Sequence, residues 1–270
     1  MSTVEDEQKR LQFQAMLLEN PSLAFAREYI GEHDDVLIVG VGPGEDLRLL
    51  FKVTDGRILA IDKNPQMVAV AEAMVKENYA DRPVTLRQMD MTKMTDVPDN
   101  SFDSTFERFV LLHATDKDRI TAFGEMIRVT KPNGHIILHE PRLDTVEVDP
   151  PSDAFTLLNK TILRAFRNQG KNPNMLEATL GLARQFEALG NVELVGFKRH
   201  MVDVIGDNIA LKAPHILVYK APFARGEILR QNLIDDGDQY DRLFKEAQDH
   251  INLPGTLVMG GTVELAFKKK

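Results

Sequence analysis

The amino-acid sequence predicts an α/β fold in which a mainly parallel β-sheet is covered by helices. Short β-rich runs alternate with helical patterns along the chain, and this alternation is typical of parallel sheets. With 270 residues, of which 43% are hydrophobic, the chain can bury one large core. The first apolar run ends in closely spaced glycines, which suit a turn between a strand and a helix. Seven strands are predicted, at 36–41, 57–62, 84–89, 102–107, 134–140, 192–202 and 257–267.

Capping residues mark the helices that follow two of these strands. After the second strand, Asn64 suits the N-cap of a helix and Pro65 suits its first turn. A further helix is expected over 116–130, where Thr115 and Asp118 form a capping pair. Both helices carry apolar residues on one face, so we expect them to pack on the sheet.

We expect a single domain over residues 1–270, with additions around a central core. No repeat, low-complexity tract or linker divides the chain. Two segments fit the strand-helix alternation poorly, and we expect them to form a helical cap over a substrate. The expected parts are N-terminal helices within 1–34 (about 4–16 and 21–31), a core over 35–142, and cap insertions at 143–190 and 205–254.

Composition excludes several classes of protein. The formal net charge of -8 argues against a nucleic-acid-binding surface, and no apolar run reaches the ~20 residues of a membrane span. The absence of cysteine excludes disulfides, and scattered histidines give no metal site, so no metal is expected. A cytoplasmic protein acting on a small molecule is therefore expected, and the sequence leaves a homodimer open.

The run "VLIVGVGPGEDL", residues 36–47, ends a buried strand with glycines at 40, 42 and 44. Glycines at such a turn let the backbone approach a ligand, although a plain tight turn remains an alternative. Asp62 ends the second strand, where a carboxylate can accept hydrogen bonds from both hydroxyls of a ribose. Asp90 follows the third strand and can accept a hydrogen bond from an adenine amino group. Three successive strand ends therefore indicate an adenosine-containing ligand.

The turn also discriminates among adenosine-containing ligands. Dinucleotide loops follow the pattern GxGxxG, whereas here Glu45 stands at the last glycine position, where its charge would repel a pyrophosphate. The lysine and hydroxyl of a phosphate-binding P-loop are also missing. S-adenosylmethionine carries a positive sulfonium and no phosphate, which suits a turn followed by Glu45 and Asp46.

Over nearly its whole length the sequence resembles the class I S-adenosylmethionine-dependent methyltransferases, particularly the ubiquinone/menaquinone-type small-molecule group. The resemblance rests on "VLIVGVGPGEDL", "GRILAIDKNPQMVAVAEAM", "VTLRQMDMTKMTDVPDNSFDSTFERFVLLHATD", "MIRVTKPNGHIILHEP" and "GKNPNMLEATLGLARQFEALGNVEL". It implies a doubly wound, Rossmann-like sheet whose last strand is antiparallel. It also implies transfer of a methyl group to an O, N or C atom of a small molecule.

The resemblance assigns cofactor contacts to individual positions. It implies that the three glycines pass beneath the methionyl part, that strand two holds the ribose and strand three the adenine, and that the end of strand four meets the ammonium. The implied cofactor-binding residues are Gly40, Gly42, Gly44, Asp62, Lys63, Met67, Asp90, Met91, Glu107 and Arg108. Alternatives stay open for three of them, namely a helix cap for Asp62, a solvated loop acid for Asp90 and a core residue for Met67.

The sequence departs from the family pattern at Ile38, where the first strand normally carries an acidic residue. An aliphatic side chain cannot bind the methionyl ammonium through a carboxylate, so another acid must compensate or the cofactor binds more weakly. This departure keeps open a methyltransferase-fold cyclase or pericyclase, or a non-catalytic scaffold that binds the cofactor. A nicotinamide-dependent oxidoreductase is a further alternative, which Glu45 disfavours.

Methyl transfer depends mainly on positioning, because the sulfonium is already a good leaving group. A general base is needed only if the nucleophile must lose a proton. We predict His113, after the fourth strand, and Glu140, at the end of the fifth, as catalytic candidates. A structural role for His113 remains an alternative. Because His139 and Glu140 are adjacent in a strand, at most one of them is expected to face the pocket.

Overall fold

The computed structural model describes residues 18–205 and 222–270, and within them the chain forms two compact units. Among the described residues, the sheet unit comprises 19–141, 175–199 and 263–270, and the insertion unit comprises Leu18, 142–174, 200–205 and 222–262. The helix predicted at about 4–16 and most of the irregular stretch predicted at the start of 205–254 lie outside the described residues. The predicted insertion 143–190 is divided between the two units, and the expected single domain stays a prediction.

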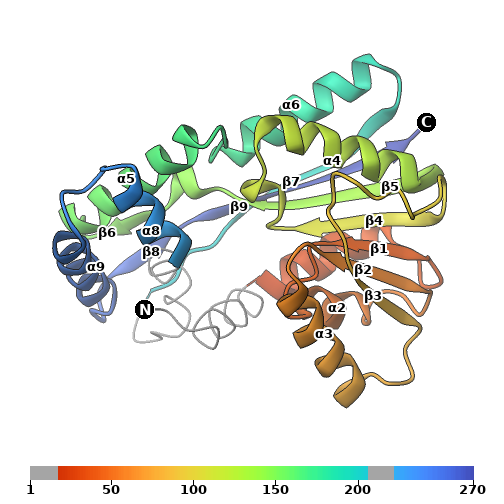
Figure 1. Ribbon diagram of the computed structural model, residues 1–270, viewed down its shortest axis with the longest axis horizontal. Helices are drawn as coiled ribbons and strands as arrows, with labels where there is room; N and C mark the ends of the chain where they lie inside the picture. The colour runs from red at the N-terminus through yellow and green to blue at the C-terminus, as the bar shows by residue number, and fades with distance from the viewer. Residues whose placement is uncertain (1–17, 206–221) are drawn as a thin grey trace. The chain divides into compact units, whose positions relative to one another are not determined.

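The sheet has seven strands in the order β3-β2-β1-β4-β5-β9-β7 (Figure 1). Its first five strands in this order pair in parallel. The strand bounds are β1 Val36–Val39, β2 Ile58–Asp62, β3 Val84–Gln88, β4 Phe102–Arg108, β5 Thr130–Pro141, β7 Val192–Met201 and β9 Gly261–Lys269. The predicted seven-stranded, mostly parallel fold is therefore confirmed.

The last strand, β9, runs antiparallel to its neighbour β5, as expected from the resemblance. The Lys269 side chain, near the end of β9, donates to the carbonyl of Thr130 at the start of β5. At the other end, the Arg142 N–H, just after β5, donates to the carbonyl of Gly261, the first residue of β9. The two strands thus have opposite directions, and β9 closes the gap between β5 and β7.

Two strands differ from their predicted bounds by more than two residues. The run 257–267 was predicted as one strand but forms β8 (Leu257–Met259) and β9, because Gly260 and Gly261 interrupt it. β8 pairs with β6 (Glu147–Asp149) in a separate two-stranded antiparallel sheet. β5 begins at Thr130 rather than at Gly134, with a shift of register against β4 where Asn133 adopts a φ of 67°.

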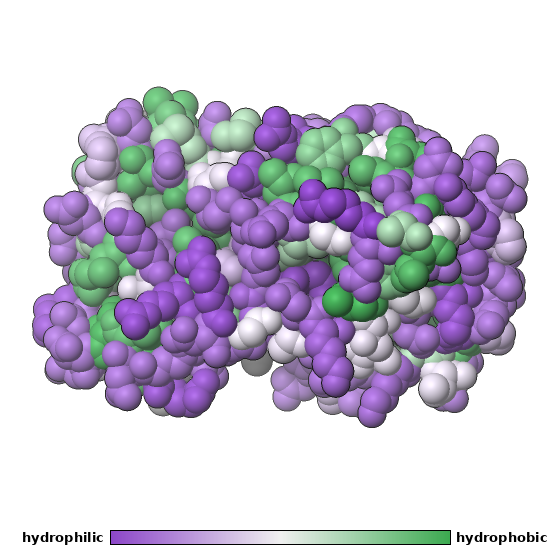
Figure 2. All heavy atoms as spheres, turned by 90° about the horizontal axis from the view of Figure 1, so that it is seen from above, coloured by the Kyte–Doolittle hydropathy of each residue, from purple (hydrophilic) through white to green (hydrophobic). Residues whose placement is uncertain are grey.

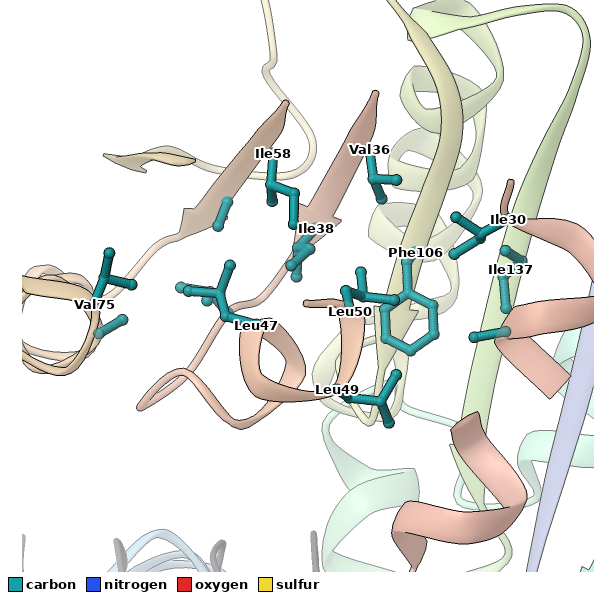
Figure 3. Packing of buried hydrophobic residues seen from close by; sticks show 14 of the residues in the cluster. Ile30, Val36, Ile38, Leu47, Leu49, Leu50, Ile58, Val75, Phe106 and Ile137 are labelled. Carbon is teal, nitrogen blue, oxygen red and sulfur yellow. The ribbon is translucent and has the colours of Figure 1, made fainter. Parts of the chain in front are cut away.

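Helices cover both faces of the sheet unit. Residues 18–29, α2 (Glu45–Leu50) and α3 (Pro65–Asn78) pack on one face, where their apolar side chains meet those of β1 and β4 (Figure 3). On the other face lie α4 (Asp116–Val129) and α6 (Met175–Ala188), joined by ring contact between Phe123 and Phe186. The predicted N-caps are confirmed, since Asn64 accepts from Gln66 N–H and Thr115 from Asp118 N–H.

The insertion unit contains α5 (Asp153–Asn168), α8 (Pro222–Arg230) and α9 (Gly237–Ile251), together with the short 3₁₀ turn η2 (Leu143–Thr145) and the β6–β8 pair. α5 packs against both α8 and α9. Its buried face carries Phe155, Leu158, Ile162 and Phe166, as its helical spacing predicts.

Polar side chains cover most of the surface drawn in Figure 2, where apolar side chains form separate patches. This distribution is ordinary for a chain with 27% charged residues. Within the two described ranges, no helix has the length and apolar character needed to cross a bilayer.

Candidate active site

The glycine turn leads from β1 into α2 with three residues in the left-handed region. Gly40, Gly42 and Gly44 have φ values of 75°, 52° and 103°. A Cβ on Gly40 would lie 2.2 Å from Cγ2 of Val110, so the turn packs tightly against the segment after β4. A Cβ on Gly42 would meet no protein atom within 4 Å. The turn is therefore packed against protein at Gly40 and open at Gly42, where a ligand can approach the backbone.

Asp62 at the end of β2 faces this open part of the turn. Its carboxylate accepts a hydrogen bond of 3.0 Å from the Gly42 N–H. Its second oxygen accepts one of 2.8 Å from Asn64 N–H, at the start of α3. The structure thus brings together two of the residues predicted to bind the cofactor, and the helix-cap role considered for Asp62 coexists with its contact to the turn.

Asp90 is linked to the same strand end through Lys63. The Lys63 ammonium lies 3.1 Å from Oδ2 of Asp90. The other Asp90 oxygen accepts hydrogen bonds from the backbone N–H and the hydroxyl of Thr92, and these bonds, with Lys63, lower the pKa of Asp90. Met67 and Met91 nearby in sequence are both half-buried. The ends of β1, β2 and β3 are therefore connected by direct contacts.

A buried ion pair joins the glycine turn to the end of β4. Nε of Arg108 lies 2.6 Å from Oδ1 of Asp46, in the first turn of α2, and each side chain is only 7% exposed. Burial raises the pKa of Asp46, and the Arg108 charge opposes this shift. Within the described residues, Asp46 is the only ion-pair partner of the Arg108 guanidinium.

Two buried carboxyl groups lie on the adjacent strands β4 and β5. Glu107 on β4 and Glu140 on β5 are fully buried, and each carboxyl group affects the pKa of the other. Burial and the neighbouring Glu140 raise the pKa of Glu107 well above its usual range. Burial also raises the pKa of Glu140 to about 7. Two carboxylates cannot both ionise in this environment at little cost, so the pair holds a proton near neutral pH.

The oxygens of this pair that face away from each other hold the segment after β4. Glu107 Oε2 accepts a hydrogen bond from the Val110 N–H at 3.2 Å. Glu140 Oε1 accepts one from the Leu112 N–H, also at 3.2 Å. Glu140 is therefore buried beneath this segment, a position that suits a positioning role.

His113 lies in the same segment, in the 3₁₀ turn η1 (Leu111–His113), and its side chain is exposed. His139, by contrast, is buried, with Nδ1 at 2.9 Å from the Ser22 hydroxyl and 3.2 Å from Glu264. His139 and Glu140 thus have different partners, as expected for adjacent strand residues. Sequence reasoning named neither the Glu107–Glu140 pair nor the Asp46–Arg108 pair, because each depends on which residues of separate elements lie opposite.

The described residues contain no group of three histidine, aspartate or glutamate side chains arranged to hold a metal ion.

Comparison with known proteins identifies the central part of the chain. Residues 37–138, from β1 to β5, match the family model described as "Methyltransferase domain". This region is therefore similar to the methyltransferase domains that the family model describes. The domain includes the glycine turn, the ends of β2 and β3, and the segment after β4.

Individual proteins resemble the methyltransferase domain or the whole chain. The ubiquinone/menaquinone biosynthesis C-methyltransferase of Bdellovibrio bacteriovorus is 34% identical over 109 residues, which are 40% of this chain and 44% of that protein. A phosphoethanolamine N-methyltransferase of Haemonchus contortus has been solved with S-adenosylhomocysteine. Its structure aligns over 93% of this chain and 52% of that protein's chain, with 19% identity and a TM-score of 0.55. The structure of the [4+2]-cyclase SpnF aligns over 92% of this chain and 80% of its own chain, with 17% identity and a TM-score of 0.56.

These likenesses differ in what they establish. The two solved structures share the fold of this chain, and one of them is an enzyme described as a cyclase. The alignments with the first curated relatives span between 29% and 57% of those proteins' own lengths. This chain therefore matches only part of the length of those relatives.

Proposed function

We propose that the protein is an S-adenosylmethionine-dependent methyltransferase that transfers a methyl group to an O, N or C atom of a small molecule. The contact between Gly42 and Asp62 carries this proposal, because it brings a turn with an open glycine against a carboxylate suited to a ribose. The methyltransferase domain over residues 37–138 supports the same function.

The residues present fit this cofactor. Asp62 and Asp90, linked through Lys63, supply acceptors for ribose hydroxyls and for an adenine amino group. The half-buried Met67 and Met91 supply apolar surface beside them. When bound, S-adenosylmethionine would supply a methyl group on positively charged sulfur. A nucleophile in line with the carbon–sulfur bond would take the methyl group, and S-adenosylhomocysteine would leave.

The methionyl end would be held at the glycine turn and the end of β4. S-adenosylmethionine carries an ammonium and a carboxylate at this end, and the Asp46–Arg108 pair offers one group of each sign beside the turn. Arg108 would bind the carboxylate, since its guanidinium has several donors and Asp46 is its only ion-pair partner among the described residues. Asp46 would face the ammonium, in place of the acid that Ile38 does not supply.

His113 would act on the substrate, and Glu140 would position the segment that carries it. The exposure of His113 supports access to a second molecule, and an imidazole nitrogen can act as a general base. Glu140 is fully buried and bonded to Leu112 N–H, which supports an indirect contribution.

One binding experiment and one turnover experiment test the proposed cofactor and the proposed reaction. Calorimetry with S-adenosylhomocysteine and with NAD distinguishes a methyltransferase from a nicotinamide oxidoreductase, and binding of NAD alone would contradict the proposal. Mass spectrometry of products formed from S-adenosylmethionine and candidate small molecules then tests turnover. Cofactor binding with a chemically changed but unmethylated substrate would favour a cyclase, an alternative that the fold shared with SpnF keeps relevant.

We also propose that the protein is a homodimer and that it acts in the cytoplasm. Two apolar side chains on the edge strand β7, Val195 and Phe197, are 38% and 43% exposed, which supports pairing with a second copy. Light scattering after size-exclusion chromatography measures the mass directly, and a mass of one chain at all concentrations would contradict the dimer.

A further inference from the structure

Three buried charged side chains hold the segment 110–114 from two sides. Glu107 and Glu140 accept hydrogen bonds from the N–H groups of Val110 and Leu112. Arg119 on α4, only 3% exposed, donates from Nε to the Leu111 carbonyl at 3.3 Å. Its Nη2 donates to the Ala114 carbonyl at 3.2 Å. We call Glu107, Glu140 and Arg119 the clamp.

This segment is in direct contact with the turn proposed to bind the cofactor. The Val110 side chain occupies the space beside Gly40 that a Cβ would otherwise fill. Phe109, which immediately precedes the segment, has a φ of 62°, a conformation that non-glycine residues rarely adopt and that the surroundings must stabilise. Hydrogen bonding of the next residues to the clamp supplies part of that stabilisation.

We propose that the clamp residues Glu107, Glu140 and Arg119 are positioning residues, which hold segment 110–114 against the glycine turn in the form that binds the cofactor. This inference rests on the proposed function and assigns three buried side chains a role that requires no side-chain contact with substrate or cofactor. Arg119 fixes carbonyl groups and the two glutamates fix N–H groups, so the segment has little freedom to move while all three remain bonded.

The clamp also makes cofactor binding dependent on a proton. Among the described residues, Glu107 Oε1 and Glu140 Oε2 have no hydrogen-bond donor, so a proton between the two carboxyl groups satisfies both. The charged groups that act on the pair are the two glutamates themselves and Arg119. When pH rises and the proton leaves, two buried negative charges repel each other, which moves the strand ends and the segment that they hold.

Glu140→Gln separates this role from simple structural support. The glutamine amide can donate to Glu107 and its oxygen can accept from the Leu112 N–H, so the hydrogen bonds remain while the shared proton is removed. We expect wild-type affinity for S-adenosylhomocysteine to fall about tenfold between pH 6 and pH 8.5. The affinity of Glu140→Gln should match wild type at pH 6 and should stay constant with pH. Glu140→Ala, which lacks both hydrogen bonds, should bind about tenfold more weakly at every pH.

Glu264→Gln is the matched control, because Glu264 is an equally buried carboxyl group in the sheet but contacts His139 rather than segment 110–114. Calorimetric titrations over this pH range should give the wild-type pH dependence for the control. A wild-type affinity that does not change with pH, or an unchanged dependence in Glu140→Gln, would overturn the proposal.

Amide hydrogen exchange in the ligand-free protein separates failure of the clamp from failure of the proposed function. Protection of the Val110 and Leu112 N–H groups should fall in Glu140→Ala and should persist in Glu140→Gln. If wild type binds no S-adenosylhomocysteine, the proposed function fails while exchange still tests the clamp. Equal protection in wild type and Glu140→Ala would show that the glutamate does not hold the segment.

Discussion

The Gly42 N–H donates a hydrogen bond of 3.0 Å to the Asp62 carboxylate, which joins the end of the second strand in the chain to the turn after the first. This contact lies at the carboxyl edge of a parallel sheet, the edge at which open α/β sheets bind their ligands. The carboxylate both supports the open glycine and remains half-exposed, so it is available to a ligand.

Replacement of Asp62 by alanine should weaken binding of S-adenosylhomocysteine by about 2–4 kcal/mol, the loss expected for two hydrogen bonds to a charged group. Calorimetry measures this difference. Asp55→Ala is a matched control, because Asp55 is exposed and precedes β2 at the opposite edge of the sheet. Equal affinities of Asp62→Ala and wild type would refute the ribose assignment.

Alanine substitutions at two glycines should separate stability from binding. Gly40→Ala places a Cβ against Val110 in a left-handed backbone and should cost about 2–5 kcal/mol of unfolding free energy. Gly42→Ala should cost only about 1–2 kcal/mol, from backbone strain, yet should weaken cofactor binding because its methyl group enters the open side. Chemical denaturation and calorimetry measure the two effects, and an equal loss of stability would contradict this reading of the turn.

Arg108→Gln should reduce affinity for S-adenosylhomocysteine but leave affinity for 5′-methylthioadenosine nearly unchanged, because the second ligand lacks the methionyl carboxylate and ammonium. A loss of about 2 kcal/mol is expected for the first ligand. The comparison removes any general effect of breaking the Asp46 ion pair. Parallel weakening of both ligands would assign Arg108 a structural role only.

The free energy of unfolding should decrease as pH rises because of the Glu107–Glu140 pair. Since the folded pKa of Glu140, about 7, lies above that of an unfolded glutamate, the folded protein holds more protons between these values. The free energy of unfolding should therefore fall, by at most about 3 kcal/mol, as pH rises from about 4.5 to 7. Urea unfolding at pH 5 and pH 8 should show this loss in wild type and a smaller loss in Glu140→Gln, in which the buried Glu107 carboxyl group remains. A difference between the two proteins that does not vary with pH would contradict it.

Ile38→Asp tests whether the absent acid can simply be restored. Ile38 is fully buried among apolar residues of the core, including Phe106 on the neighbouring strand (Figure 3). A carboxylate there should cost about 4 kcal/mol of stability and should not increase affinity for S-adenosylhomocysteine. Ile38→Val, expected to lose about 1 kcal/mol, is the control. Tighter binding by a folded Ile38→Asp protein would show that this position does reach the ammonium.

Features set by local sequence were predictable. The Asn64 and Thr115 caps follow from side chains placed just before apolar helical patterns, and the number and order of the sheet's strands along the chain follow from runs of apolar residues. Because the carboxyl ends of parallel strands share one edge, Gly42, Asp62 and Asp90 could be grouped without coordinates.

Features set by register and burial were not predictable. Glu107 and Glu140 lie 33 positions apart, and only the pairing of β4 with β5 turns two ordinary acids into a proton-sharing pair. Arg119 carries no signal in sequence, since an arginine on a helix is usually exposed. Likewise, two glycines, 260 and 261, end β8 and begin β9 within a run whose apolar pattern reads as one strand.

The place of β9 has a consequence for how the sheet is completed. This strand, residues 261–269, lies between β5 and β7, although both neighbours are made earlier in the chain. During synthesis on the ribosome, the edges of β5 and β7 that pair with β9 therefore have no partner strand until β9 emerges. Until then the nascent chain exposes hydrogen-bonding edges that invite aggregation or chaperone capture.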